Sequence, residues 1–204
     1  MNIIICPGIH KLELTRGFLE GLQWRGNEHL SGDGQIGNVW IFPTQEYPAY
    51  SAVCILQFLE ECRLKTLSDP STELPVIFIS FSAGVVGAIG AAWGWQLLGR
   101  QVKAFIAVDG WGVPLSGNFP IHRLSHDYFT HWSSALLGSG NDSFYADPSV
   151  DHLQLWHQPQ DVRGCWVRAP GTEKQFSSAG EKSLTTAAKF ITHLLQIYGY
   201  RIRW

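Results

Sequence analysis

The chain has 204 residues, with 15 basic and 17 acidic side chains, a formal net charge of −2 and 45% hydrophobic residues. A chain of this length can bury one large core, so residues 1–204 are expected to form a single domain. Charges spread without runs predict neither a nucleic-acid surface nor an anionic-lipid surface. The apolar opening at 3–6 is too short for a signal peptide or a membrane span, so we expect a cytoplasmic protein without stable membrane insertion.

The cysteines give no sign of a cross-linked or metal-bound structure. Their spacing contains no C-x-x-C pair, which argues against a disulfide framework and a zinc site. They are Cys6, Cys54, Cys62 and Cys165. The oligomeric state is left open by the sequence.

Short apolar runs that predict buried strands alternate with helical patterns along the chain. The runs lie at 3–6, 39–42, 76–79, 102–108, 119–127 and 144–147. Apolar spacing predicts one helix over about 49–67 and another from Leu184 to Tyr198, where Gly199 suits the position after a helix end. This alternation predicts an α/β domain with a mostly parallel sheet of about six strands and helices on both faces.

The sequence at 32–37 matches the glycine pattern of dinucleotide-binding loops, but its position argues against that use. A dinucleotide loop follows a strand and opens a helix, whereas this segment precedes the run at 39–42. We interpret it as a turn, and no cofactor is expected.

The segment 76–85 carries the most informative pattern. A β-branched apolar run breaks into Ser80-Phe81-Ser82-Ala83-Gly84 and then into a helix of small residues. A serine on so tight a strand-to-helix turn needs small residues two positions before and two positions after it. Ser80 and Gly84 meet that need, so the segment is typical of a nucleophile elbow with Ser82 as the nucleophile.

With this elbow the chain resembles the α/β-hydrolase superfamily over nearly its whole length. The resemblance implies a small α/β-hydrolase fold without a cap domain, and a triad in the chain order serine, acid, histidine. Ser82, Asp127 and His152 satisfy that order. The loop at 7–10 resembles the family's oxyanion loop, which implies that the backbone N–H groups of Ile9 and Ala83 hold the oxyanion.

Two of the triad positions have competitors. A histidine can take the proton of Ser82 and a carboxylate can orient that histidine, and His152 is preferred because it follows the last predicted strand. Asp127 is preferred over Asp109, which also ends an apolar strand, because the family usually places its acid one strand later. The other candidate histidines are His10, His122, His126, His131 and His157. His122, His126, Asp127 and His131 straddle a strand end, so no metal site is expected.

Aromatic side chains are expected to line the substrate pocket, because ligands bind at the carboxyl edge of such sheets. The pocket residues so predicted are His10, Phe81, Trp111, Tyr128 and Trp132. Together these features predict a serine hydrolase that cleaves a small-molecule carboxylic ester or thioester through an acyl-enzyme. The alternative is a non-catalytic protein of the same fold that binds a hydrophobic small molecule.

Overall fold

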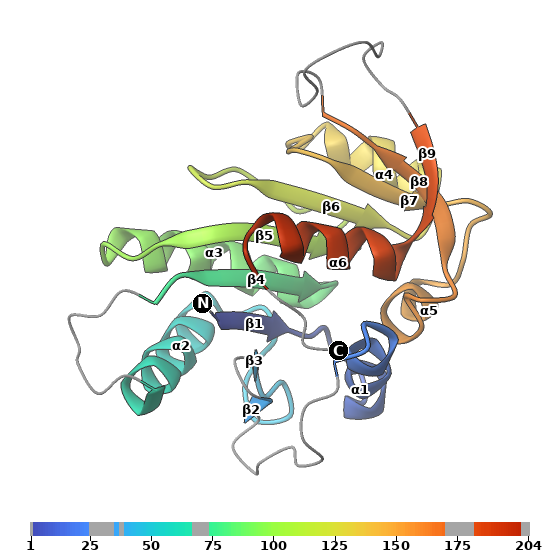
Figure 1. Ribbon diagram of the computed structural model, residues 1–204. Helices are drawn as coiled ribbons and strands as arrows, with labels where there is room; N and C mark the ends of the chain where they lie inside the picture. The colour runs from blue at the N-terminus through green and yellow to red at the C-terminus, as the bar shows by residue number, and fades with distance from the viewer. Residues whose placement is uncertain (1, 25–34, 37–38, 67–73, 170–181, 201–204) are drawn as a thin grey trace.

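The predicted strands lie side by side in one sheet. The computed structural model describes residues 2–24, 35–36, 39–66, 74–169 and 182–200. Within these ranges nine strands occur in the order β2-β3-β1-β4-β5-β6-β7-β8-β9 (Figure 1). Their bounds are β1 Asn2–Cys6, β2 Gln35–Ile36, β3 Val39–Ile41, β4 Val76–Phe81, β5 Val102–Val108, β6 Ile121–Ser125, β7 Ser143–Ala146, β8 Arg163–Val167 and β9 Lys182–Thr186.

Six neighbouring strands, from β3 to β7 in the sheet order, run parallel. This part of the sheet confirms the prediction of a mostly parallel α/β architecture. β2, β8 and β9 pair antiparallel at the two edges and raise the strand number above the predicted six. These edge strands were not predicted, because β2 has only two residues and β8 is a short run without alternation that contains Gly164.

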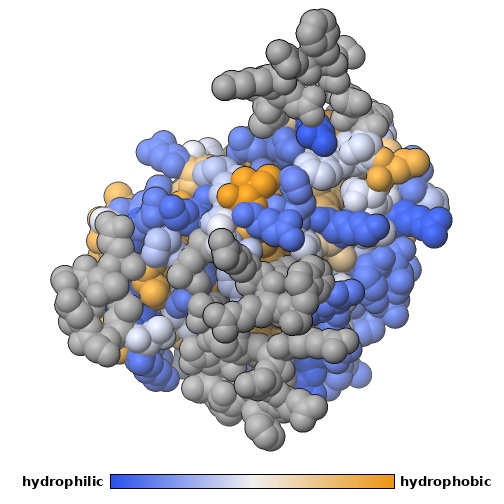
Figure 2. Space-filling view, viewed as in Figure 1, coloured by the Kyte–Doolittle hydropathy of each residue, from blue (hydrophilic) through white to orange (hydrophobic). Residues whose placement is uncertain are grey.

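Helices cover both faces of the sheet, as predicted. The helices are α1 Leu12–Gly21, α2 Ala52–Thr66, α3 Ala83–Leu97, α4 Tyr128–Ala135, α5 His152–His157 and α6 Ala187–Ile197. Side chains alternate along β1, so Ile3 and Ile5 pack with the core beneath α1, α5 and α6, whereas Ile4 and Cys6 pack with the core beneath α2 and α3. The outer side of the α6 face is mostly hydrophilic, with apolar residues in small groups (Figure 2).

The C-terminal helix begins later than its apolar spacing predicts. Residues from Lys182 to Thr186 form β9, and Leu184 is exposed on this strand rather than buried on a helix. Thr186 caps α6, because its side chain accepts a hydrogen bond from the Lys189 N–H at 3.3 Å. The end of the helix is as predicted, with Gly199 at φ 84°.

The chain connections leave in opposite directions on the two sides of β1. β1 leads through α1 to β3 on one side, and β3 leads through α2 to β4 on the other side of β1. In open α/β sheets, ligands bind where neighbouring connections leave in opposite directions. The loop at 7–10 and the turn at Ser82 both lie at this point. Across the described ranges, no helix has both the length and the apolar character needed to cross a membrane.

Candidate functional site

Ser82 occupies a strained turn between β4 and α3. Its backbone has φ 52° and ψ −123°, a combination that non-glycine residues rarely adopt, and its N–H donates to the Val108 carbonyl at 3.0 Å. A Cβ on Gly84 would overlap the backbone carbonyl oxygens of Cys6 and Pro7. The loop after β1 therefore presses directly on the turn, and this contact explains why the position two residues after Ser82 is a glycine.

His152 joins Ser82 to a carboxylate. Its Nε2 lies 3.1 Å from Ser82 Oγ, and its Nδ1 lies 2.8 Å from Asp109 Oδ2. A carboxylate only accepts hydrogen bonds, so Nδ1 carries the proton and Nε2 is left with a lone pair that faces the Ser82 hydroxyl. This tautomer is the one that a general base requires. His152 is the first residue of α5, and its neighbour Asp151 caps this helix by accepting from the Leu153 N–H at 2.9 Å.

The carboxylate beside His152 is that of Asp109. The sequence analysis placed Asp127 there, and the structure does not agree with that placement. Asp109 directly follows β5, the strand next to β4, and is buried. Asp127 instead caps α4, where its Oδ1 accepts from the Thr130 N–H at 2.6 Å. Partial burial acts to raise the pKa of Asp127, but the hydrogen bonds from Thr130 and the charge of His126 together hold that pKa below its usual value. The immediate start of α4 turns this carboxylate away from His152.

A second histidine binds the same carboxylate. His126 donates its backbone N–H to Asp109 Oδ1 at 2.9 Å, and its Nδ1 lies 2.9 Å from Asp109 Oδ2. Its Nε2 lies 3.5 Å from Asp127 Oδ2. The hydrogen bond to Asp109 raises the pKa of His126 above its usual value, and this effect exceeds the opposing effect of burial. Asp109 thus accepts hydrogen bonds from two imidazoles at one oxygen.

Asp109, His126 and His152 are also close enough to be considered as a metal site. Their ligand atoms lie within 4.8 Å of one another. Both Nδ1 atoms, however, already lie at hydrogen-bond distance from Asp109 Oδ2, and an ion between them would replace both bonds. We therefore treat the three side chains as a hydrogen-bond network.

A cavity of about 290 Å³ opens beside Ser82. Of the predicted site residues, Ser82, Ala83, His152 and Trp111 line it. Val86, Val113 and Thr130 add an apolar or small lining that the sequence interpretation did not include. Val86 lies four residues after Ser82, one turn along α3, so helical spacing could have identified it. Ile9 is 76% exposed and is not part of the lining, although its neighbour Gly8 lies against Ser82.

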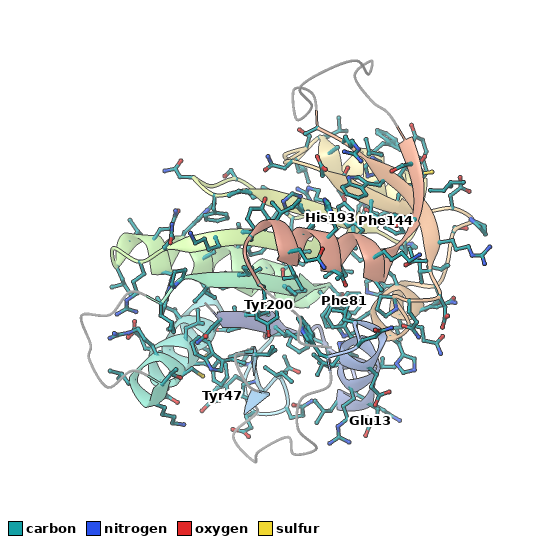
Figure 3. The ribbon with its side chains drawn as sticks, in the orientation of Figure 1. Glu13, Tyr47, Phe81, Phe144, His193 and Tyr200 are labelled. Carbon is teal, nitrogen blue, oxygen red and sulfur yellow. The ribbon has the colours of Figure 1, made fainter. Side chains whose placement is uncertain are left out.

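The other predicted pocket residues lie elsewhere. Phe81 is buried because its side chain points to the α1 and α5 side of the sheet (Figure 3), where it stacks on His152. His10 lies against Phe81, with ring centroids 5.5 Å apart. Tyr128 lines a different hollow of about 490 Å³ near β7, and Trp132 points outward against Phe129. Tyr128 and Trp132 lie one helical turn apart on α4, and both side chains are exposed.

No model of a known protein family matches the chain, and no curated protein matches it at a significant level.

Proposed function

We propose that the protein is a serine hydrolase of the α/β-hydrolase fold, with Ser82 as nucleophile, His152 as general base and Asp109 as the acid that orients it. One observation carries this proposal: the continuous hydrogen-bond path from Ser82 Oγ through both nitrogens of His152 to Asp109. Its location supports it further, because the serine sits on a positive-φ turn between a central parallel strand and a helix.

The reaction proceeds by two acyl transfers. Ser82 Oγ attacks the substrate carbonyl while its proton moves to His152 Nε2, and Asp109 stabilises the resulting imidazolium. His152 then gives this proton to the leaving alcohol or thiol as the acyl–O or acyl–S bond breaks. A water molecule then attacks the acyl-enzyme while its proton moves to His152, and His152 gives this proton to Ser82 Oγ as the acyl–Oγ bond breaks and the carboxylic acid leaves.

The oxyanion is held at the start of α3. The N–H of Ala83 belongs to the first turn of this 15-residue helix, where N–H groups lack helical partners and the helix dipole favours negative charge. Ile9 supplies the second backbone N–H from the loop at 7–10, which packs against the turn through Gly8. Each such donor contributes about 3 kcal/mol to the stability of the transition state.

The cavity favours a short acyl group. Its volume of about 290 Å³ and its lining by Val86, Val113 and Trp111 suit a small apolar chain rather than a long one. We therefore propose esters or thioesters of short carboxylic acids as the substrate class. No cofactor takes part in this reaction.

A fluorophosphonate probe followed by intact-mass spectrometry tests the proposal. The wild type is expected to gain one adduct, and Ser82→Ala and His152→Ala are expected to lose it. Ser80→Ala is the matched control, because the Ser80 hydroxyl lies two residues away but is buried and faces the Ile106 carbonyl at 3.4 Å. This variant keeps the adduct.

A panel of p-nitrophenyl acetate, butyrate and octanoate, with an acetyl thioester, then identifies the preferred acyl chain. The acetate and butyrate are expected to be the better substrates. Folded wild-type protein that gains no adduct and hydrolyses none of these compounds would favour the alternative function, the binding of a hydrophobic small molecule.

A further inference from the structure

The carboxylate of Asp109 has more partners than a catalytic triad needs. One hydrogen bond, to His152 Nδ1, is sufficient to orient a general base. Here His126 adds two more, from its backbone N–H to Oδ1 and from its Nδ1 to Oδ2. Asp109 is itself buried, so these bonds replace the water that an isolated carboxylate would require. His126 is therefore built into the support of the acid.

We propose that His126 is a positioning residue that fixes the Asp109 carboxylate against His152 and, when protonated, slows the reaction. This inference rests on the proposed function. The positioning part follows from the geometry: a carboxylate held at both oxygens cannot rotate, so Oδ2 stays directed at His152 Nδ1.

The effect of charge follows from what surrounds His126. Three carboxylates face it, from Asp109 after β5, from Asp127 at the start of α4 and from Asp151 before α5. They favour its protonated form. The imidazole of His152 also lies near, with ring centroids 6.0 Å apart.

A charged His126 opposes the catalytic step. When Ser82 transfers its proton, His152 becomes a second cation on the same carboxylate oxygen. Two unit charges about 6 Å apart at an effective dielectric constant of about 80 to 20 repel enough to slow the step by about 3- to 100-fold. We therefore expect kcat to increase, within that range, as the pH rises through the titration of His126.

The decisive experiment measures kcat and KM for one short ester between about pH 5 and pH 9 in the wild type, His126→Asn and His126→Ala. The side-chain amide of asparagine can occupy the place of Nδ1, donating to Asp109 without a charge. At alkaline pH we expect His126→Asn to keep a kcat close to the wild type, and His126→Ala to lose roughly 10- to 100-fold in kcat with KM little changed. The wild type is expected to show two ionisations on its acid limb, and His126→Asn only one.

His131→Asn is the matched control, because His131 is a histidine on α4 outside the cavity lining. It should leave kcat and the pH profile unchanged. Asp127→Asn provides a second variant that does not alter the packing around Asp109. It removes the carboxylate 3.5 Å from His126 Nε2, so the upper ionisation of the wild-type profile should move to lower pH while the maximal kcat stays within a few-fold of the wild type.

Two results would overturn the proposal. One is an equal kcat loss in His126→Asn and His126→Ala with the wild-type pH profile retained, which would indicate a packing role. The other is full activity in His126→Ala. Failure of the proposed function itself is distinguishable, because the wild type would then neither react with the fluorophosphonate nor hydrolyse the ester.

Discussion

The ring of Phe81 lies nearly parallel to the imidazole of His152, with centroids 4.7 Å apart and planes inclined by 25°. Phe81 also stacks on Trp156 at 4.9 Å, and Trp156 stacks on Phe18 of α1 at 3.8 Å. His152 and Trp156 are both on α5, one helical turn apart. The Phe81 side chain therefore fixes the helix that carries the proposed base to the strand that carries the proposed nucleophile.

Replacing Phe81 by leucine should affect both stability and turnover. Leucine keeps most of the buried volume but removes the flat surface on which His152 rests, so we expect a loss of about 1 to 2 kcal/mol in the free energy of unfolding and a lower kcat. Urea unfolding and ester hydrolysis measure the two effects. Phe144→Leu is the matched control, since Phe144 in β7 (Figure 3) is equally buried but packs on Phe190 of α6. An equal loss of kcat in both variants would contradict the role given to Phe81.

The two candidate acids should behave differently when each is changed to asparagine. Asp109→Asn replaces an acceptor with a donor opposite His152 Nδ1 and favours the wrong tautomer, so kcat should fall by about 10³- to 10⁴-fold. Asp127→Asn keeps a good helix cap on α4 and leaves His152 untouched, so the maximal kcat should stay within a few-fold of the wild type and stability should fall by less than about 1 kcal/mol. Steady-state kinetics at the pH optimum compare them. A larger kcat loss from Asp127→Asn would refute the assignment of Asp109.

Gly84 should not tolerate even one added methyl group. Alanine there would collide with the backbone oxygens of Cys6 and Pro7, so the loop at 7–10 and the Ser82 turn would have to move apart. We expect a loss of about 2 to 3 kcal/mol in the free energy of unfolding and a large loss of fluorophosphonate reactivity. Gly94→Ala, on the same helix, meets only the end of the Leu56 side chain and should be nearly neutral. Retained labelling in Gly84→Ala would show that the loop contact does not shape the turn.

The parallel part of the sheet could be predicted because its strands are continuous β-branched runs bounded by breakers. The antiparallel edge could not be predicted, because the sequence there fits both a helix and a strand. Leu184 fits the helical spacing of the residues that follow. However, the Thr186 side chain accepts a hydrogen bond from the Lys189 N–H, so the helix begins after Thr186. The preceding residues are then free to pair with β8. The Thr186 cap thus sets the start of α6 three residues after the start that the apolar periodicity predicts.

Chain order predicted the pairing of Ser82 with His152, which lie in contact in the structure, but it placed Asp127 rather than Asp109 beside the histidine. Asp109 and Asp127 both follow apolar strands, and a linear pattern does not say which carboxylate reaches the histidine. The distinction lies in the next few residues: Asp127 is followed by a helix whose N–H groups need a cap, whereas Asp109 has φ 50° and turns into the site. An aspartate such as Asp127 just before a helical segment, three residues before Thr130, is a typical sequence signal of a helix cap, and this signal was available.

His122 should make the fold less stable in acid. It is buried, and burial lowers its pKa below the usual value. Its Nδ1 lies 2.8 Å from the Asp142 carbonyl and must donate, so its Nε2 accepts from the Tyr198 hydroxyl at 2.7 Å. Burial and the nearby Asp142 raise the pKa of Tyr198 to about 12, which keeps this hydroxyl protonated as a donor. The neutral imidazole is thus fully paired, and a second ring proton would face the Tyr198 hydroxyl.

The sign of the pH dependence follows from that pairing. Below about pH 6.5, His122 is protonated in the unfolded chain but stays neutral in the folded chain. The free energy of unfolding should therefore fall as the pH drops, by up to about 1.4 kcal/mol per pH unit, until the pH reaches the pKa of His122 in the folded chain. His122→Asn should be less stable at neutral pH but lose less on acidification. Urea unfolding of the wild type and His122→Asn is measured at several pH values between about 7.5 and 5. Because His10 and His126 titrate in both proteins, the difference between the two free energies of unfolding gives the contribution of His122. Parallel curves would show that His122 accepts a proton as readily in the folded chain as in the unfolded one.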